Sequence, residues 1–299
     1  MFTAEADDPE QPDTFPDPPY IVRHASAPPI SVVVDSPHSG MEWPTDFQPF
    51  AARDAILTTW DAFVDELWAG APGVGAALLA ARFPRAYIDV NRAVDDIDTE
   101  LLDGPWPGPI GVTDYTRRGM GLIRRNALPG QPMYDRRLKP AAVQLRLDRF
   151  YHPYRAALTA LIDGRHHSFG AVVHLNAHSM KSRGNAMNVD SGALRPDIVV
   201  SDRHGTTADA ALTAWTADWF RSQGLTTQVN TPYQGGALVA QFGAPGSGRQ
   251  SIQIELNRGL YMDEARFERS QGFDALQRTL TTFVDALGRR LGAEDEQRS

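Results

Sequence analysis

Short apolar runs rich in valine and isoleucine alternate with longer amphipathic segments along this chain, and this alternation constrains the fold most. Runs of this kind indicate buried strands, and they lie at 30–36, 85–90, 171–177, 197–201, 226–230 and 251–257. Helical spacing of apolar residues is clearest at 52–69, 140–163, 206–222 and 268–291. Strands that alternate with helices, without an internal repeat or a linker, predict a single α/β domain.

The two ends of the chain differ in composition from the rest. Residues 1–20 are rich in proline and acidic side chains, so they cannot bury enough surface to fold alone and predict a flexible arm. We therefore expect one domain over residues 21–292 and a frayed polar tail over residues 293–299.

Composition also excludes several classes of protein. The net charge of −8 argues against nucleic acid or an anionic membrane as the main partner and favours a small-molecule substrate. No apolar run approaches the roughly 20 residues of a membrane helix. The amino terminus has neither a basic nor an apolar signal region, so we expect a cytoplasmic enzyme. The chain has no cysteine, and any transition-metal site must therefore use His, Asp or Glu.

Two histidines lie just past predicted strands. His38 follows Val32-Val33-Val34, and His178 follows Val172-Val173. Open α/β sheets bind ligands at the carboxyl ends of their strands, so both imidazoles are candidate metal ligands. A single histidine after a strand is more often structural, and the assignment needs further residues that converge on the same place.

Asp61 is the carboxylate best aimed at the interior from the predicted helix 52–69. A rotation of about 100° per residue puts it on the flank of the apolar face, with Asp65 on the far side and Glu66 off the face in the other direction. The alternative is an exposed or salt-bridged helix acid.

The predicted strand 251–257 alternates cleanly between apolar and polar residues, and Glu255 lies on its polar side. Such alternation often means a solvated sheet face. A glutamate near a strand end, opposite histidines at other strand ends, is also well placed to act as a general base toward a metal-bound water.

Asn91 and Arg92 directly follow the predicted strand 85–90. A guanidinium fork matches the two oxygens of a carboxylate, and an adjacent amide adds a directional hydrogen bond, so the pair could clamp an acidic substrate. In the alternative, Arg92 pairs with one of the acids Asp95, Asp96 and Asp98.

Seven short motifs in order resemble those of the N-formylglutamate amidohydrolase family. They are Ser36-Pro37-His38-Ser39-Gly40, Asp89-Val90-Asn91-Arg92, Gly121-Leu122-Ile123, Tyr151-His152-Pro153-Tyr154, Leu175-Asn176-Ala177-His178-Ser179, Thr231-Pro232-Tyr233-Gln234-Gly235-Gly236 and Gln253-Ile254-Glu255-Leu256-Asn257-Arg258. The resemblance implies a single-domain mixed sheet flanked by helices, similar to zinc carboxypeptidases and aspartoacylase.

The same resemblance implies one zinc ion held by His38, Asp61 and His178. Residue 41 is methionine, so the short His-x-x-Glu spacing of carboxypeptidases is absent, and Glu66 and Asp65 remain alternatives to Asp61. Glu255 matches the family's catalytic glutamate. Asn91 and Arg92 match its substrate clamp, and a nearby arginine, Arg124 or Arg258, would stabilise the oxyanion.

The implied activity is zinc-dependent hydrolysis of an N-formyl or short N-acyl acidic amino acid, most directly N-formyl-L-glutamate. Two alternatives stay open. One is a zinc metallopeptidase or amidase that acts on another peptide-like substrate. The other is a non-catalytic protein that keeps the fold and binds a carboxylate.

Overall fold

The computed structural model describes residues 15–296. Much of the predicted arm falls on residues 1–14, which lie outside the described residues, and a strand begins at Tyr20. The last helix continues to Glu296, past residue 293, where the frayed tail is predicted to start. The remaining tail residues, 297–299, also lie outside the described residues.

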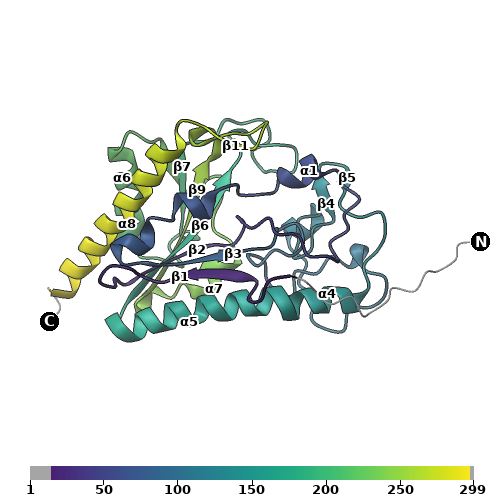
Figure 1. Cartoon of the computed structure of the whole chain (residues 1–299), viewed down its shortest axis with the longest axis horizontal. Coiled ribbons are helices and arrows are strands. Elements are labelled where there is room, and N and C mark those ends of the chain that lie inside the picture. Colours follow the sequence, from purple (N-terminus) through teal and green to yellow (C-terminus); the bar gives the residue numbers. More distant parts are fainter. Residues whose placement is uncertain (1–14, 297–299) are drawn as a thin grey trace, which may run out of the picture.

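A seven-stranded mixed sheet forms the centre of the molecule (Figure 1). Its strands, in spatial order, are β1 (Tyr20–Arg23), β3 (Ala77–Ala81), β2 (Val32–Ser36), β6 (Val172–Met180), β9 (Arg249–Asn257), β7 (Ile198–Ser201) and β8 (Thr227–Val229). Strands β3, β2, β6 and β9 are parallel, while β1 and β7 each join this block in the antiparallel direction. The carboxyl ends of the four parallel strands therefore meet at one edge of the sheet. The α/β fold with a mixed sheet is confirmed.

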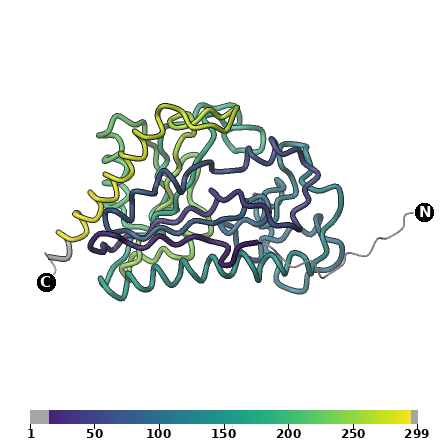
Figure 2. The backbone as a smooth tube through the Cα atoms, viewed as in Figure 1, coloured from purple at the N-terminus to yellow at the C-terminus, as the bar shows by residue number. Residues whose placement is uncertain are grey.

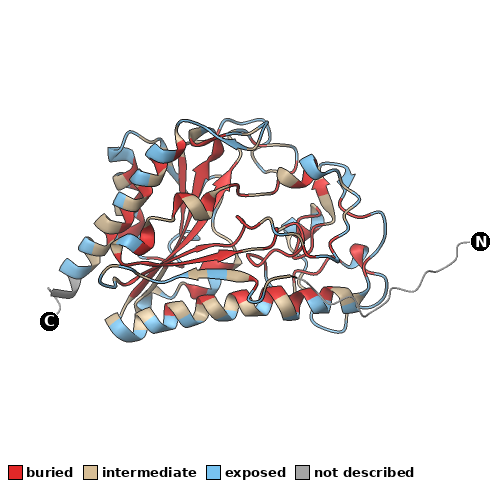
Figure 3. Cartoon of the chain, in the orientation of Figure 1, coloured by how far each residue is buried: buried red, intermediate tan, exposed pale blue. Residues whose placement is uncertain are grey.

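Helices cover both faces of the sheet. The helix α5 (His152–Phe169) runs beneath the strands in Figure 2 and buries Tyr154, Leu158 and Ile162, which are spaced four residues apart. The short α7 (Ala237–Phe242) contacts β6 and β9 and shares a hydrophobic core with α5. Figure 3 shows that the central strands are buried while the outer sides of the helices are exposed.

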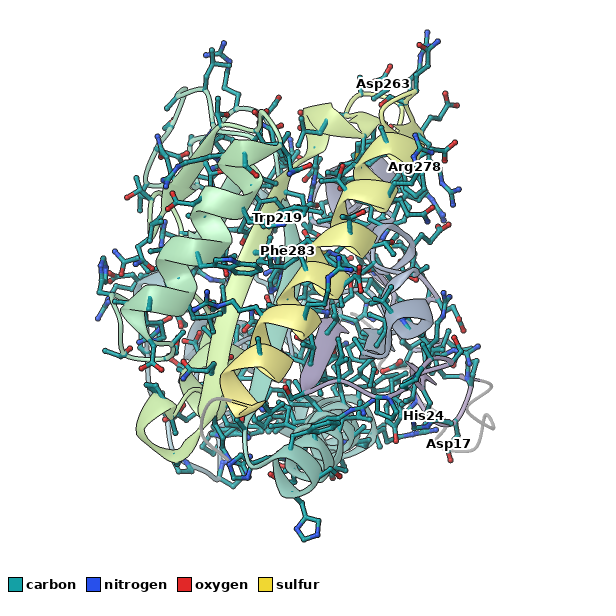
Figure 4. The ribbon with its side chains drawn as sticks, turned by 90° about the vertical axis from the view of Figure 1, so that its left-hand side faces the viewer. Asp17, His24, Trp219, Asp263, Arg278 and Phe283 are labelled. Atoms are coloured by element: carbon teal, nitrogen blue, oxygen red, sulfur yellow. The ribbon has the colours of Figure 1, made fainter. Side chains whose placement is uncertain are left out.

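The opposite face is covered by α2 (Val64–Leu67), α6 (Ala210–Ser222) and α8 (Phe273–Glu296). Figure 4 shows Trp219 of α6 beside Phe283 of α8, and their ring centroids are 5.2 Å apart. The predicted helices 206–222 and 268–291 correspond to α6 and α8. No helix among the described residues is long and apolar enough to span a bilayer.

The remaining elements are short. They are α1 (Arg53–Leu57), α3 (Asp114–Arg117), α4 (Pro140–Arg146), β4 (Asn126–Leu128), β5 (Gln131–Pro132), β10 (Met262–Asp263), β11 (Glu268–Arg269), a π-helical turn over Leu147–Tyr151, and 3₁₀ turns at Ala71–Val74, Thr99–Leu101, Pro245–Ser247 and Arg258–Leu260. The π-helical turn joins α4 to α5 just before Pro153, which has no N–H to donate within a helix.

The predicted strand 85–90 is wrong. The segment forms turns instead, in which Tyr87 N–H donates to the carbonyl of Pro84 and Arg92 N–H donates to that of Asp89. The strand at this place in the sheet is β3, made only of alanine and leucine. These residues favour helices in isolation, so burial between β1 and β2 outweighs their intrinsic preference.

The predicted helix 52–69 is also wrong as one helix, because it breaks into α1 and α2. The hydroxyls of Thr58 and Thr59 bond back to the carbonyls of Ala55 and Ile56, which ends α1. Phe63 then adopts a left-handed backbone conformation, with φ of 62°, just before α2. Asp61 lies in the turn between the two helices.

Candidate metal centre and anion cavity

Three side chains from separate parts of the chain converge at the carboxyl edge of the sheet. His38 follows β2, His178 lies near the end of β6, and Asp61 lies between α1 and α2. Asp61 Oδ2 is 3.0 Å from His178 Nδ1 and 3.4 Å from His38 Nδ1. All three residues are buried, and one ligand atom from each lies within 4.8 Å of the other two. The residues form a possible metal site.

The donor atoms fit a small transition-metal ion. Bonds of about 2.0–2.1 Å in tetrahedral geometry place neighbouring ligand atoms about 3.3 Å apart, close to the two separations from Asp61. His38 Nδ1 is buried without a hydrogen-bond partner among the described residues. A buried imidazole nitrogen without a partner is costly in a metal-free protein, and a metal ion would satisfy it.

The far side of each imidazole is held by a protein oxygen. His38 Nε2 lies 2.7 Å from Asp89 Oδ1, and His178 Nε2 lies 2.8 Å from Asn176 Oδ1. Such contacts to the second ring nitrogen are typical of metal-binding histidines, since they fix both the ring and its tautomer. The pattern leaves the two Nδ1 atoms to face Asp61.

Asp61 remains a carboxylate although it is buried. Its Oδ1 accepts a hydrogen bond of 3.1 Å from Arg258 Nη2. Burial favours the neutral acid, but the imidazoles of His178 and His38 and the nearby charge of Arg85 outweigh it and hold the pKa of Asp61 well below its usual range. The alternative ligand Glu66 pairs with Arg269 instead.

A cavity of about 100 Å³ opens beside Asp61, and its charged lining is mainly cationic. The basic residues that line it are Arg85, Arg124, Lys181, Arg195 and Arg258. Arg85 and Arg258 contact Asp61, and Arg195 pairs with Asp190.

Two of these cations form no salt bridge among the described residues. Arg124 makes no hydrogen bond or ion pair there, and burial together with the charge of Arg85 lowers its pKa to about 9. Burial and the charges of Arg258 and Arg124 lower the pKa of Lys181 to about 8. Two unpaired cations in a small cavity indicate an anionic ligand.

Glu255 lies on β9 directly opposite His178 in the parallel register. Its Oε1 accepts a hydrogen bond of 2.8 Å from Gln253 Nε2, and the residue is only 6% exposed. The polar side of β9, on which Glu255 lies, is therefore buried near the end of the strand and is not a solvated sheet face. Burial and the charge of Asp61 raise the pKa of Glu255, despite the opposing effect of His178.

The predicted clamp residues have other partners. Arg92 Nε donates to the carbonyl of Met120, Nη1 donates to that of Asn91, and the guanidinium lies 4.0 Å from the ring centroid of Tyr115. Arg92 does not line the cavity, and the alternative in which it pairs with an acid at positions 95–98 is wrong. Asn91 Oδ1 accepts from the N–H of Leu238.

Sequence reasoning did not assign four residues that the structure places around the site. Asp89 and Asn176 both lie inside the family motifs, but the sequence does not show that Asp89 contacts His38 or that Asn176 contacts His178. Lys181 follows His178 by three residues and is one of only two lysines in the chain. Arg85, at the start of the segment misjudged as a strand, donates to Asp89.

Comparisons with known proteins agree on one family. A family model described as N-formylglutamate amidohydrolase matches residues 30–262. The N-formylglutamate deformylases of Pseudomonas putida and Pseudomonas aeruginosa are 24% and 26% identical, each over 79% of this chain and 83% of its own. A crystal structure of N-formylglutamate amidohydrolase from Ralstonia eutropha JMP134 is 42% identical with a TM-score of 0.88, and the match covers 93% of this chain and 99% of that one.

Proposed function

Because this chain belongs to the N-formylglutamate amidohydrolase family and is a hydrolase, we propose that it cleaves N-formyl-L-glutamate to formate and glutamate with a bound zinc ion. The observation that carries the proposal is the convergence of His38 Nδ1, His178 Nδ1 and Asp61 Oδ2 beside a cationic cavity.

The cavity suits a small substrate with two carboxylates. Arg124 interacts electrostatically with Asp61 and Asp89, so it lies near the proposed metal position, where the α-carboxylate next to the reacting amide would lie. Lys181 interacts instead with Arg258, Arg124, Arg195 and Glu264. We therefore assign the side-chain carboxylate of the substrate to Lys181 and the α-carboxylate to Arg124. The role of Arg92 as a carboxylate ligand stays a prediction from the sequence, and it competes with this assignment of the α-carboxylate to Arg124.

His38, His178 and Asp61 would hold the zinc ion. When bound, zinc supplies Lewis acidity that polarises the formyl carbonyl and lowers the pKa of a water. Arg258 lines the cavity but donates to Ser179 Oγ, the carbonyl of Thr58 and Asp61 Oδ1, and we assign it to the orientation of Asp61.

Glu255 would move the proton. The water oxygen bonds to the formyl carbon, and a carboxylate oxygen of Glu255 takes the proton from that water. The C–N bond then breaks, and Glu255 passes the proton to the leaving nitrogen. The bond from Gln253 fixes Oε1, and the raised pKa suits a group that must both accept and return a proton.

The test is formate release from N-formyl-L-glutamate, with and without a chelator and with zinc added back. We expect turnover that the chelator abolishes and zinc restores. N-formyl-L-methionine is the matched control, since it keeps the formyl amide and the α-carboxylate but lacks the second charge. Equal turnover of both substrates would contradict the dicarboxylate assignment, and chelator-resistant turnover would contradict the metal.

One rival function predicts a different outcome of the same assay. Absence of formate release together with tight binding of glutamate would favour the non-catalytic carboxylate-binding protein.

A further inference from the structure

We propose that the side-chain amides of Asn185 and Asn188 bind the second substrate carboxylate together with Lys181 and set the preference for a carboxylate over a carboxamide. The inference rests on the proposed function and deepens it, because it names the groups that read the end of the substrate side chain. Both asparagines are then specificity-determining residues that take no part in the cleavage of the amide bond.

The segment that follows β6 supplies much of the cavity lining. Lys181, Asn185, Met187, Asn188 and Arg195 all line the cavity. The two asparagines are the neutral polar side chains of this set, and they lie three residues apart on either side of a turn. The segment that places Lys181 in the cavity therefore also places two amides there.

The turn fixes which way each amide faces. Asn188 Oδ1 accepts from the main-chain N–H of Asn185 at 2.9 Å, and Asn185 Oδ1 accepts from the main-chain N–H of Met187 at 2.9 Å. A main-chain N–H can only donate, so both amide oxygens must face the turn. Each Nδ2 carries two hydrogens, and neither Nδ2 has an acceptor among residues 15–296. The amides are therefore free donors beside an ammonium group.

The turn is held in place by contacts on both of its sides. Arg118 Nη1 donates to the carbonyl of Met187 at 3.0 Å and ties the turn to the residue that follows α3. Beyond the turn, Arg195 Nε and Nη2 donate to the carboxylate of Asp190 at 2.7 and 2.8 Å, and Arg195 Nη1 donates to the carbonyl of Lys181 at 3.2 Å. Donors on a fixed turn lose little conformational entropy when a ligand binds, so they can select a ligand by geometry.

The amides add a selection by hydrogen-bond direction to the charge of Lys181. A carboxylate has two oxygens that only accept, whereas a carboxamide has one oxygen and one NH₂ group that donates. The ammonium of Lys181 can bind one oxygen of either ligand, and the asparagine amides meet the second position as donors. A carboxylate oxygen accepts from them there, but the NH₂ group of a carboxamide meets donors and finds no acceptor. The arrangement therefore favours N-formyl-L-glutamate over N-formyl-L-glutamine.

The test replaces each amide with a carboxylate of the same shape, in Asn185→Asp and Asn188→Asp. The retained Oδ1 still accepts from the turn, while the donor that faces the ligand becomes an acceptor. Ala186→Asp is the matched control, because Ala186 is exposed in the same turn and does not line the cavity, so this variant gains the same charge outside the site.

Two kinds of readout are needed. The first is kcat/KM for formate release from N-formyl-L-glutamate and from N-formyl-L-glutamine. The second is the affinity for L-glutamate and for L-glutamine, measured by calorimetry, which does not depend on turnover. Zinc content and the thermal unfolding midpoint of each variant show whether the fold and the metal site are kept.

We expect kcat/KM for N-formyl-L-glutamate to fall about 10- to 150-fold in each asparagine variant, because each loses a hydrogen bond to a charged group. The value for N-formyl-L-glutamine should stay within about threefold or rise, because the new carboxylate accepts from its NH₂ group. The affinities for L-glutamate and L-glutamine should change in the same directions. Zinc content and the unfolding midpoint should stay as in the wild type, and Ala186→Asp should change none of these readouts.

An unchanged ratio of the two kcat/KM values in both folded asparagine variants would overturn the proposal, and so would an equal change of that ratio in Ala186→Asp. If the wild type hydrolyses N-formyl-L-glutamate and the asparagine variants keep its preference, the proposed function stands and this inference fails. If the affinities change as expected but the wild type releases no formate from N-formyl-L-glutamate, the failure belongs to the proposed function and not to this inference.

Discussion

Replacing Lys181 with methionine should remove the recognition of the second substrate carboxylate. Lys181 lines the cavity and makes no ion pair among the described residues, so its ammonium is free for a ligand. A hydrogen bond to a charged group contributes about 1.5–3 kcal/mol, and Lys181→Met should therefore lower kcat/KM for N-formyl-L-glutamate by about 10- to 150-fold. With N-formyl-L-glutamine, which has a neutral amide in that position, the loss should stay within about threefold.

The pH profile gives a second signature of the same residue. Burial and the charges of Arg258 and Arg124 lower the pKa of Lys181 to about 8. The charged form binds the carboxylate and is present below that pKa, so kcat/KM of the wild type should fall as the pH rises through about 8. Lys181→Arg keeps its charge at high pH, so the fall near pH 8 should disappear in this variant, and only the fall from the loss of the Arg124 charge, near pH 9, should remain.

Lys139 offers a matched control, since it is the only other lysine and is exposed. Lys139→Met should leave kinetics and pH profile unchanged. Equal losses for N-formyl-L-glutamate and N-formyl-L-glutamine in Lys181→Met would refute the assignment, because they would show a general effect on the site.

Three further predictions address the chemistry, the clamp and the fold. Glu255→Gln should keep its metal content while turnover falls by roughly 10² to 10⁴, and near-normal turnover would remove Glu255 from the mechanism. Because Arg92 already donates to two main-chain carbonyls, methylation of the substrate α-carboxylate should lower kcat/KM by the same factor in Arg92→Lys and in the wild type. A smaller decrease in the variant would show that Arg92 binds that carboxylate. Phe283→Ala should lower the free energy of unfolding in urea by about 3–5 kcal/mol, and a loss below about 1 kcal/mol would contradict its place in the core.

Elements with strong local patterns could be predicted from the sequence. β2, β6, β7, β8 and β9 carry apolar β-branched runs or clean alternation, and α8 carries a long stripe of leucine and phenylalanine, so burial and local preference agree. β3 could not be predicted because alanine and leucine favour a helix until neighbouring strands enclose them. The break between α1 and α2 depends on the hydroxyls of Thr58 and Thr59, which donate to main-chain carbonyls one turn earlier. The spacing of apolar residues does not reveal such hydrogen bonds.

The site could be predicted in part for a similar reason. His38, His178 and Glu255 lie at or near strand ends, where the sheet itself brings them to one edge. Asp61 was selected from the geometry of a helix that does not exist at that residue, and it reaches the cluster from a turn in which its N–H donates to the carbonyl of His38. Asp89 and Lys181 act through contacts between segments distant in sequence, and no local pattern marks such contacts.

The most direct test of the central claim is the metal content of the purified protein and of two ligand variants. Elemental analysis after dialysis should find about one zinc per chain in the wild type, and X-ray absorption should show two imidazoles and a carboxylate around it. His38→Ala and His178→Ala should each lose most of that zinc while Lys139→Met keeps it. Full zinc occupancy in both histidine variants would contradict a metal centre built on His38, Asp61 and His178.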